Sequence, residues 1–229
     1  MIAIIPARGG SKRIPRKNLK EFSGINILTR TIQKTLNSKL FSRVIVSTDD
    51  EEIQKIARTA GAEVVVRGKH LSDDFTETVP VVADAIKSIF QEKEIASLVV
   101  CCIYPVTPLL NYQRISESVD LLNQTHCDYV FPSMESFNPL GREFKILEDF
   151  KIFINSPKGL AKRTQDIERF YFDAGQFYLG MAKTWLAQKS LISPHSRVIV
   201  LNKYEVIDVD TLEDWHFTEE LYRIRYPEI

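Results

Sequence analysis

The chain has 229 residues, and its 30 lysines and arginines balance its 30 aspartates and glutamates, so the formal net charge is zero. This length predicts one domain, residues 1–229, and a neutral chain without an extended basic stripe is not expected to bind nucleic acid. The chain has three cysteines without metal-ligand spacing, which predicts a cytoplasmic protein without disulfides. It has no apolar run of about 18 residues, so no membrane partner is expected.

The first predicted element is a buried strand at Ile2–Ile5, which ends at Pro6 in a loop rich in positive charge. Gly9 and Gly10 permit positive φ and let backbone N–H groups approach a ligand closely. Five cations and no acid in ten residues of a neutral chain predict a polyphosphate site, the alternative being a solvated basic turn. The loop lacks the P-loop and dinucleotide-binding patterns, which indicates another nucleotide chemistry. The cations are Arg8, Lys12, Arg13, Arg16 and Lys17.

Short β-branched runs alternate with helical patterns through the first 131 residues, as in a parallel sheet covered by helices on both faces. The predicted elements are, in chain order, a helix at Leu28–Leu36, a strand at Val44–Ser47, a helix at Glu51–Thr59, a strand at Val64–Val66, a helix at Val79–Phe90, a strand at Leu98–Ile103, a helix at Ile115–Leu122 and a strand at Tyr129–Phe131. We therefore expect a doubly wound, mostly parallel, Rossmann-like α/β sheet. Ligands of such sheets bind beyond the carboxyl ends of the strands, where residues 6–17, 48–50 and 104–111 fall.

Between Ser133 and Arg169 the alternation fades into an irregular insert. Long irregular segments in a compact enzyme are usually functional or form an interface. Seven apolar residues lie between Phe144 and Ile154, which is too many for a solvated loop, so we expect the insert to form the contact of a homodimer. The alternative is that these residues cover their own sheet.

Three more strands and a closing helix follow the insert. They are predicted at Phe177–Leu179, Val198–Leu201, Glu205–Val209 and Thr211–Arg225, with Thr211 as the N-cap of the helix. Asp208 and Asp210 alternate along the last strand, which would point both carboxylates to one face as ligands for one or two Mg²⁺ ions. The alternative is that Asp210 only begins the turn into the helix. The polyphosphate loop favours the metal, because a triphosphate reacts as its Mg²⁺ complex.

The stretch from Ile5 to Asn18 reads Ile-Pro-Ala-Arg-Gly-Gly-Ser-Lys-Arg-Ile-Pro-Arg-Lys-Asn. It resembles the amino-terminal signature of the sugar-activating cytidylyltransferases, which make CMP-linked nonulosonic acids. Further matching motifs follow in the same order at residues 44–50, 71–78, 104–109, 163–166, 173–178 and 207–211. The resemblance implies a fold of nucleotidyltransferase type and an enzyme that transfers CMP from CTP to the anomeric hydroxyl of a nonulosonic acid, releasing pyrophosphate.

The resemblance also implies roles for the loop and for the acid pair. Arg8 would hold the β- and γ-phosphates, Lys12 the α-phosphate and Lys17 the leaving pyrophosphate. Asp208 and Asp210 would hold Mg²⁺. The predicted catalytic residues are Arg8, Lys12, Lys17 and Asp208. The predicted CTP-binding residues are Ala7, Arg8, Gly9, Gly10, Ser11, Lys12, Lys17, Arg67, Asp74 and Thr78.

For the sugar, the resemblance predicts contacts from the stretch after the strand at Leu98–Ile103, from the end of the insert and from the segment after the insert. The predicted sugar-binding residues are Tyr104, Thr107, Arg163, Gln165, Asp166, Asp173 and Gln176. Residues 163–166 would act either in their own subunit or across the dimer, and the alternative for them is a charged surface loop.

The identity of the sugar rests on departures from the sialic acid synthetases. Tyr104 and Leu110 stand where those enzymes usually have an amide and an arginine, and Phe172 and Ala174 also break their pattern. The changes resemble the pseudaminic acid cytidylyltransferases, whose sugar is less hydroxylated and carries apolar acetamido methyls. We therefore expect pseudaminic acid, because a hydrogen-bonding pocket rejects misplaced polar groups. The alternatives are legionaminic or N-acetylneuraminic acid and, from a different class, a catalytically silent nucleotide-binding regulatory protein.

Overall fold

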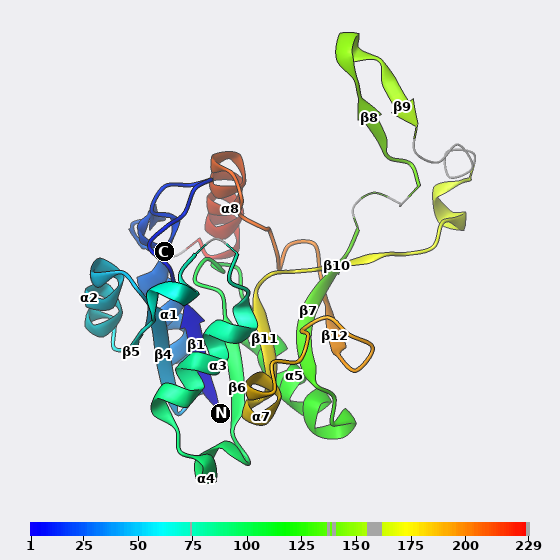
Figure 1. Ribbon diagram of the computed structural model, residues 1–229. Coiled ribbons are helices and arrows are strands. Elements are labelled where there is room, and N and C mark those ends of the chain that lie inside the picture. The colour runs from blue at the N-terminus through cyan, green and yellow to red at the C-terminus, as the bar shows by residue number, and fades with distance from the viewer. Residues whose placement is uncertain (74, 137, 139–140, 155–161, 228–229) are drawn as a thin grey trace.

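The computed structural model describes residues 1–73, 75–136, 138, 141–154 and 162–227. The strands of its main sheet are β1 (Ile2–Pro6), β4 (Arg43–Thr48), β5 (Glu63–Val66), β6 (Val99–Ile103), β7 (Tyr129–Glu135), β10 (Tyr171–Asp173), β11 (Phe177–Met181) and β12 (Arg197–Leu201). Their order is β10-β7-β11-β6-β1-β4-β5 (Figure 1). β10 and β11 pair with successive parts of β7, and β12, which lies off this path, also pairs with β7.

Most of these strands run parallel to their neighbours. β1 pairs in parallel with β4 and β6, β4 with β5, and β7 with β12, whereas β10 and β11 run antiparallel to theirs. The doubly wound, mostly parallel sheet expected from the sequence is confirmed. The carboxyl ends of β1, β4, β5 and β6 meet at one edge, so the loops that follow these strands lie together.

The helices cover both faces of the sheet. They are α1 (Ile27–Asn37), α2 (Glu51–Thr59), α3 (Thr78–Ile89), α4 (Glu92–Ile95), α5 (Tyr112–Thr125), α7 (Ala182–Leu186) and α8 (Leu212–Arg225). Ala3 and Ile5 of β1 pack with α1, α2 and α5, and Ile2 and Ile4 pack with α3 and α7. Burial from both sides explains the unbroken apolar run of β1, and each such isoleucine stabilises the fold by roughly 1.5–3 kcal/mol.

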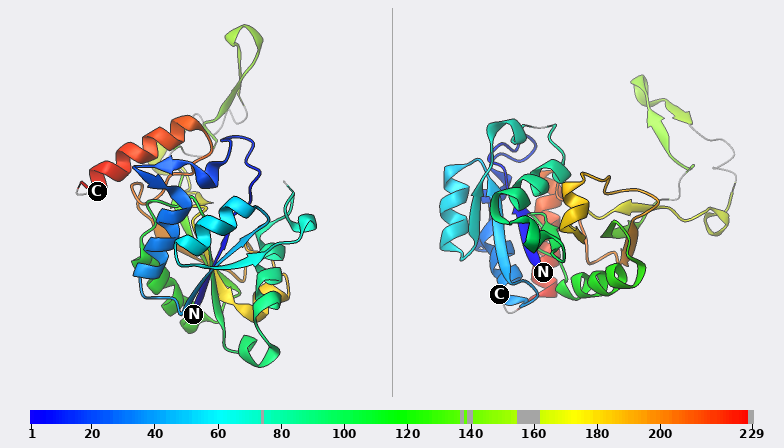
Figure 2. Two further views of the ribbon diagram at one scale, coloured as in Figure 1. Left: turned by 90° about the vertical axis from the view of Figure 1, so that its left-hand side faces the viewer. Right: turned by 60° about the horizontal axis from the view of Figure 1, so that its bottom comes forward.

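Helix α8 crosses the end of the sheet where the loops gather (Figures 1 and 2). Its N-cap is Thr211, as predicted, and a reciprocal bond to Asp214 completes a capping box. Trp215 and Tyr222 pack with Ile14 from the basic loop and with Leu109. These apolar contacts fix the basic loop against α8.

The strand predicted at Glu205–Val209 is wrong, because residues 206–210 form no regular structure. The buried apolar residues are Val206 and Val209, three residues apart, and they enter two different clusters. A strand would bury every second residue on one face. Asp208 and Asp210 therefore do not reach the sheet edge by strand alternation, although both lie in the connection that leads into α8.

The predicted insert carries a hairpin of its own, β8 (Phe144–Ile146) and β9 (Ile152–Ile154), which the sequence did not suggest. In Figures 1 and 2 this hairpin projects away from the sheet. Its apolar side chains are exposed in the single chain, and Phe150 is 92% exposed. They do not cover their own sheet, so that alternative is wrong.

Smaller elements complete the described part of the chain. A two-stranded piece, β2 (Glu21–Phe22) and β3 (Ile25–Asn26), precedes α1, and short 3-10 helices span Lys17–Leu19, Lys69–Leu71, Glu148–Phe150 and Thr164–Asp166. Among the residues described, none belongs to a helix long and apolar enough to cross a membrane.

Candidate active site

Two adjoining cavities open at the carboxyl edge of the sheet. The larger one has a volume of about 630 Å³, within the range of ligand pockets, and the smaller one about 110 Å³. They share four lining residues, Lys17, Asn18, Tyr104 and Pro105. A molecule bound in the larger cavity therefore meets the smaller one at the Lys17 and Tyr104 side chains.

The larger cavity is lined by cations from two loops. The loop after β1 supplies Arg8, Lys12, Arg13 and Lys17, and the loop after β5 supplies Arg67; the hydroxyls of Ser11 and of Thr78, the first residue of α3, line the cavity as well. The Nη1 of Arg8 donates to the carbonyl of Asp73 at 3.0 Å, which ties the two loops together. The concentration of positive charge fits the predicted polyphosphate site.

Arg67 forms the buried side of this cavity. Only 6% of the residue is exposed, and its Nη2 donates to the Ser47 carbonyl at 2.6 Å. Burial lowers the pKa of Arg67. A guanidinium remains charged at such a site because its ordinary pKa is above 12, so Arg67 brings a fixed cation to the cavity.

The glycines of the basic loop act differently from the prediction. Neither Gly9 nor Gly10 has a positive φ, whereas Arg16 does, at 55°. Gly9 is required for close packing instead, because a Cβ atom there would lie 3.0 Å from the Cβ of Asp50. A Cβ on Gly10 would meet nothing within 4 Å.

Arg16 and Asp50 fix the loop to the start of α2. The Arg16 guanidinium donates to Asp50 Oδ2 and to Glu52 Oε2, each at 2.5 Å, and Asp50 Oδ1 caps α2 by accepting from the Ile53 N–H at 3.0 Å. The hydrogen bond from Arg16 holds the pKa of Asp50 below its usual range. Arg16 does not line the larger cavity, so its role is to anchor the loop.

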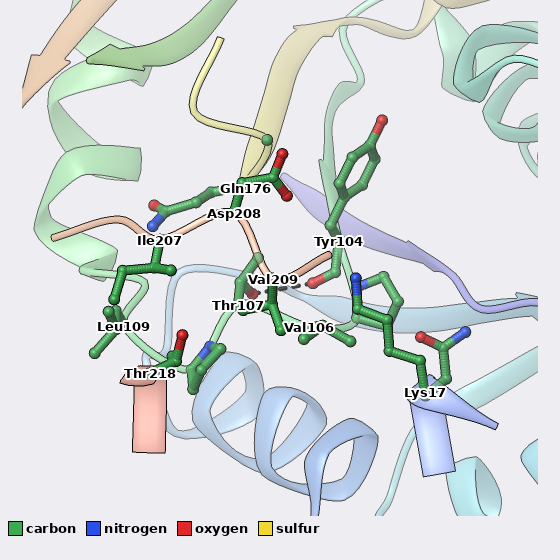
Figure 3. Close-up of a pocket in the computed structure, with 14 residues that line it drawn as sticks. Lys17, Tyr104, Val106, Thr107, Leu109, Gln176, Ile207, Asp208, Val209 and Thr218 are labelled. Carbon is green, nitrogen blue, oxygen red and sulfur yellow. Dashed lines mark hydrogen bonds between the residues drawn. The ribbon is translucent and has the colours of Figure 1, made fainter. Parts of the chain in front are cut away.

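The smaller cavity combines polar groups from four segments that are far apart in the sequence (Figure 3). Asp208 and Gln176 come from one side, and Lys17 and Tyr104 from the other (Figure 3). Thr107 also lines it, but its hydroxyl donates to the Tyr104 carbonyl at 3.0 Å and so stabilises the turn after β6.

Tyr104 stands between the two cavities. Its hydroxyl shares a hydrogen bond of 2.7 Å with Thr78 Oγ1, and its ring meets the edge of Tyr178 with centroids 5.5 Å apart. Tyr178 in turn donates to Asp173, whose other carboxylate oxygen accepts from the Gly175 N–H at 3.0 Å. Burial raises the pKa of Tyr104, so the phenol stays protonated and can donate.

Opposite charges surround the acid pair. Arg13 forms an ion pair with Asp210, and the Lys17 Nζ lies 3.9 Å from Asp210 Oδ1. Partial burial, followed by the like charge of Asp210, raises the pKa of Asp208. Burial lowers the pKa of Lys17, although both carboxylates oppose this change.

The acid pair fits Mg²⁺ in charge and ligand type. Mg²⁺ usually takes one or two protein carboxylates and completes its shell with water and substrate phosphates. Within the described ranges, no group of three or more His, Cys, Asp and Glu side chains could enclose a metal ion. A metal held by Asp208 and Asp210 would therefore depend on the phosphates for further ligands.

Some predicted residues lie elsewhere. Arg163 and Asp166 pair with each other at 2.9 Å, and neither they nor Gln165 lines either cavity. Their segment lies at the outer end of β10 (Figure 1). Asp74 lies outside the described residues.

The residues used to distinguish the sugar are also separated by the fold. Leu110 is 3% exposed and packs in the core beneath α1, so it does not replace an arginine in a sugar pocket. Phe172 is exposed on β10, and Ala174 is buried against Leu201 and Val206. Among the four, only Tyr104 lines a cavity described here.

Two residues at the carboxyl edge of the sheet, Asn18 and Glu205, were not predicted as site residues from the sequence. Asn18 lines both cavities, and its Nδ2 donates to the Arg8 carbonyl at 2.9 Å. Its position next to Lys17 in the opening motif was the available signal. Glu205, which holds Gln176, gave no signal, because a single acid at the start of a predicted strand belongs to no motif.

Known proteins match the chain over nearly its whole length. A family model described as Cytidylyltransferase matches residues 2–184. The pseudaminic acid cytidylyltransferase of Campylobacter jejuni subsp. jejuni serotype O:2 is 38% identical over 226 residues, which cover 98% of this chain and 97% of that protein. The CMP-N,N'-diacetyllegionaminic acid synthase of Legionella pneumophila subsp. pneumophila is 30% identical over 234 residues, covering 98% and 97%.

A solved structure supports the fold. The CMP:2-keto-3-deoxy-manno-octonic acid synthetase complexed with CTP aligns with a TM-score of 0.67, covering 100% of this chain and 99% of that one. The sequence identity is 13%, so this likeness concerns the fold alone.

Proposed function

Because this chain belongs to the cytidylyltransferase family, we propose that it transfers CMP from CTP to the anomeric hydroxyl of a nonulosonic acid. The sugar oxygen forms a bond to the α-phosphorus of CTP, the bond from that phosphorus to the bridging oxygen breaks, and pyrophosphate leaves. The hydroxyl proton is lost in the same reaction. The observation that carries the proposal is the meeting of a cation-lined cavity with an acid-bearing one at Lys17.

The larger cavity is proposed as the CTP site. Arg8, Lys12 and the backbone from Ala7 to Ser11 would bind the triphosphate, and Arg67 with Thr78 would face the nucleoside. This reaction needs positioning and charge neutralisation more than a covalent nucleophile. A dense set of cations at a fixed loop supplies both, since the loop is tied through Asp73 to the loop after β5 and through Arg16 to the start of α2.

The smaller cavity is proposed as part of the sugar site. Tyr104 and Gln176 would contact the sugar, and Asp173 would contribute through its bond to Tyr178. With a volume of about 110 Å³ the cavity accepts only one end of a nine-carbon sugar. The rest of the sugar would extend toward β10 and the partner subunit.

Mg²⁺ is proposed as the cofactor, held by Asp208 and Asp210. When bound, it would neutralise phosphate charge and orient the triphosphate. Lys17, which lies beside Asp210 and lines both cavities, would keep a positive charge at the junction of donor and acceptor.

A homodimer is proposed through the insert at about residues 133–169, with residues 1–229 forming one catalytic domain. Exposed apolar side chains on β8 and β9 support this, because large exposed patches usually mark interfaces. Arg163 and Asp166 would then approach the partner's cavity. Light scattering at micromolar concentration tests the dimer, and a monomer would reject it.

Pseudaminic acid is the proposed sugar, supported by the 38% identical relative and by Tyr104. The test is pyrophosphate release on mixing the protein with CTP, Mg²⁺ and each of several nonulosonic acids. We expect kcat/KM for pseudaminic acid at least about 10²-fold above that for N-acetylneuraminic acid, the scale of mismatched buried hydrogen bonds. Equal use of N-acetylneuraminic acid would overturn the sugar assignment, and CTP binding without release would indicate a catalytically silent protein.

A further inference from the structure

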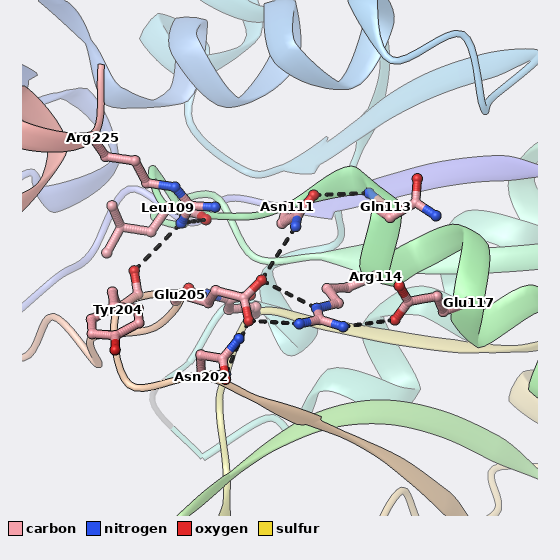
Figure 4. A network of polar contacts seen from close by, with 10 residues as sticks. Leu109, Asn111, Gln113, Arg114, Glu117, Asn202, Tyr204, Glu205 and Arg225 are labelled. Atoms are coloured by element: carbon pink, nitrogen blue, oxygen red, sulfur yellow. Dashed lines mark hydrogen bonds and ion pairs between the residues drawn. The ribbon is translucent and has the colours of Figure 1, made fainter. Parts of the chain in front are cut away.

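A partly buried ion pair joins Arg114 and Glu205, which line neither of the two cavities. Glu205, in the turn after β12, has a side chain that is only 8% exposed, and Arg114 lies in the first turn of α5. The Arg114 Nε and Nη2 donate to the two carboxylate oxygens at 3.1 and 2.9 Å (Figure 4). Asn111 Nδ2 and the Asn202 N–H also donate to this carboxylate, at 3.2 and 2.9 Å.

The same residue holds a wall of the cavity through its backbone. The Glu205 carbonyl accepts a buried hydrogen bond of 2.6 Å from the Gln176 Nε2. The Gln176 carbonyl accepts from the Tyr104 N–H at 2.9 Å. A continuous chain of polar contacts thus runs from Arg114 to both Gln176 and Tyr104, which line the cavity (Figure 3).

The bond to Glu205 also determines how the Gln176 amide is turned. A carbonyl oxygen can only accept, so the nitrogen of the Gln176 amide must face Glu205. The amide oxygen is then the atom that can accept a hydrogen bond from a hydroxyl or N–H group of the sugar. If Glu205 shifted, the amide would lose this fixed orientation.

We propose that Glu205 and Arg114 are positioning residues for the acceptor sugar, which they align through Gln176. This inference rests on the proposed cytidylyl transfer. We expect the effect on the acceptor to be larger than the effect on CTP, because neither residue lines the larger cavity and Gln176, the side chain that Glu205 holds directly, lines only the smaller of the two cavities. A displacement of about 1 Å at a reacting group can cost roughly 10²-fold in rate.

A carboxylate is required at position 205 because its four partners are all N–H donors. Replacing it with glutamine would turn an NH₂ group toward at least one of these donors. The mismatch would push the turn outward and move the carbonyl that holds Gln176. Glu117 provides a matched control, because it accepts from the same arginine at 2.9 Å but is 38% exposed and has no bond to the cavity wall.

The experiment compares Glu205→Gln, Arg114→Lys and Glu117→Gln in the full chain. Pyrophosphate release gives KM for the best nonulosonic acid at saturating CTP, and calorimetry gives the CTP dissociation constant without sugar. We expect Glu205→Gln to raise the sugar KM about 10-fold or more and to leave CTP binding within about twofold. Glu117→Gln should change neither by more than about twofold, since exposed ion pairs contribute little.

Arg114→Lys carries the test if Glu205→Gln does not fold, because lysine keeps the charge but cannot make both bonds. If Glu205→Gln or Arg114→Lys folds and has the same sugar KM as Glu117→Gln, the inference is overturned. A parallel loss of CTP affinity would also overturn it, because that loss would indicate a general structural role. A wild-type protein that releases no pyrophosphate with any nonulosonic acid would instead reject the proposed function.

Discussion

Gly9 and Gly10 are adjacent and chemically identical, yet the structure predicts opposite outcomes when each is replaced by alanine. A Cβ on Gly9 would stand 3.0 Å from the Asp50 Cβ and 3.1 Å from its Cγ, below the carbon–carbon contact of about 3.5–4.0 Å. Asp50 cannot rotate away freely, because its carboxylate caps α2 and binds Arg16. A Cβ on Gly10 would meet nothing within 4 Å.

The expected cost of Gly9→Ala is the strain of overpacking, about 1–3 kcal/mol, including the weakening of a helix cap that is itself worth about 1 kcal/mol. For a chain of this size that lowers Tm by roughly 2–12 °C. Gly10→Ala should stay within about 0.5 kcal/mol of the wild type. Urea and thermal unfolding of the CTP-free proteins measure both, and equal stability of the two variants would refute the packing role of Gly9.

Three further outcomes follow from the site. Arg8→Ala should lower turnover about 10²–10³-fold with the fold intact by circular dichroism, because it removes a charge-assisted phosphate contact, and wild-type pyrophosphate release would remove that role. Asp208→Asn should raise the Mg²⁺ concentration needed for half-maximal activity, since an amide is a poorer ligand for a hard cation, and an unchanged Mg²⁺ titration would count against the site. Burial would raise the pKa of Glu205, but the hydrogen bonds from Arg114 and its other donors outweigh it and lower the pKa from 4.5 to about 2. The stability gained from this depressed pKa is present above pH 4.5 and lost as the pH falls toward 2. The free energy of unfolding of Glu205→Gln should therefore depend less on pH between 4.5 and 2 than that of the wild type. Parallel curves of unfolding free energy against pH for the two proteins would contradict this.

The sheet and its helices were predictable because their signals are local. An apolar run such as Ile2–Ile5 indicates a strand buried on both faces, and Thr211 before an amphipathic stretch indicates a helix start. The segment before α8 misled the prediction, since alternating aspartates resemble a strand whereas the buried residues are Val206 and Val209. Its course is set by two separate clusters, which only the tertiary structure brings together.

The charge of the basic loop shows why a site cannot be read fully from residue types. The sequence predicted that all five cations of the loop contribute to a polyphosphate site. In the structure, Arg16 binds Asp50 and Glu52, more than thirty positions later in the sequence. Arg13 binds Asp210, near the other end of the chain. Four of the five cations, all except Arg16, line the larger cavity, and one of the four, Arg13, is also paired with Asp210. The acids that bind Arg16 and Arg13 belong to other parts of the chain, and the sequence of the loop itself does not predict which acids they are. Long-range pairing decides which cations face the proposed triphosphate and which hold the loop in place, so substitutions at Arg16 are expected to act through loop geometry rather than through a phosphate contact.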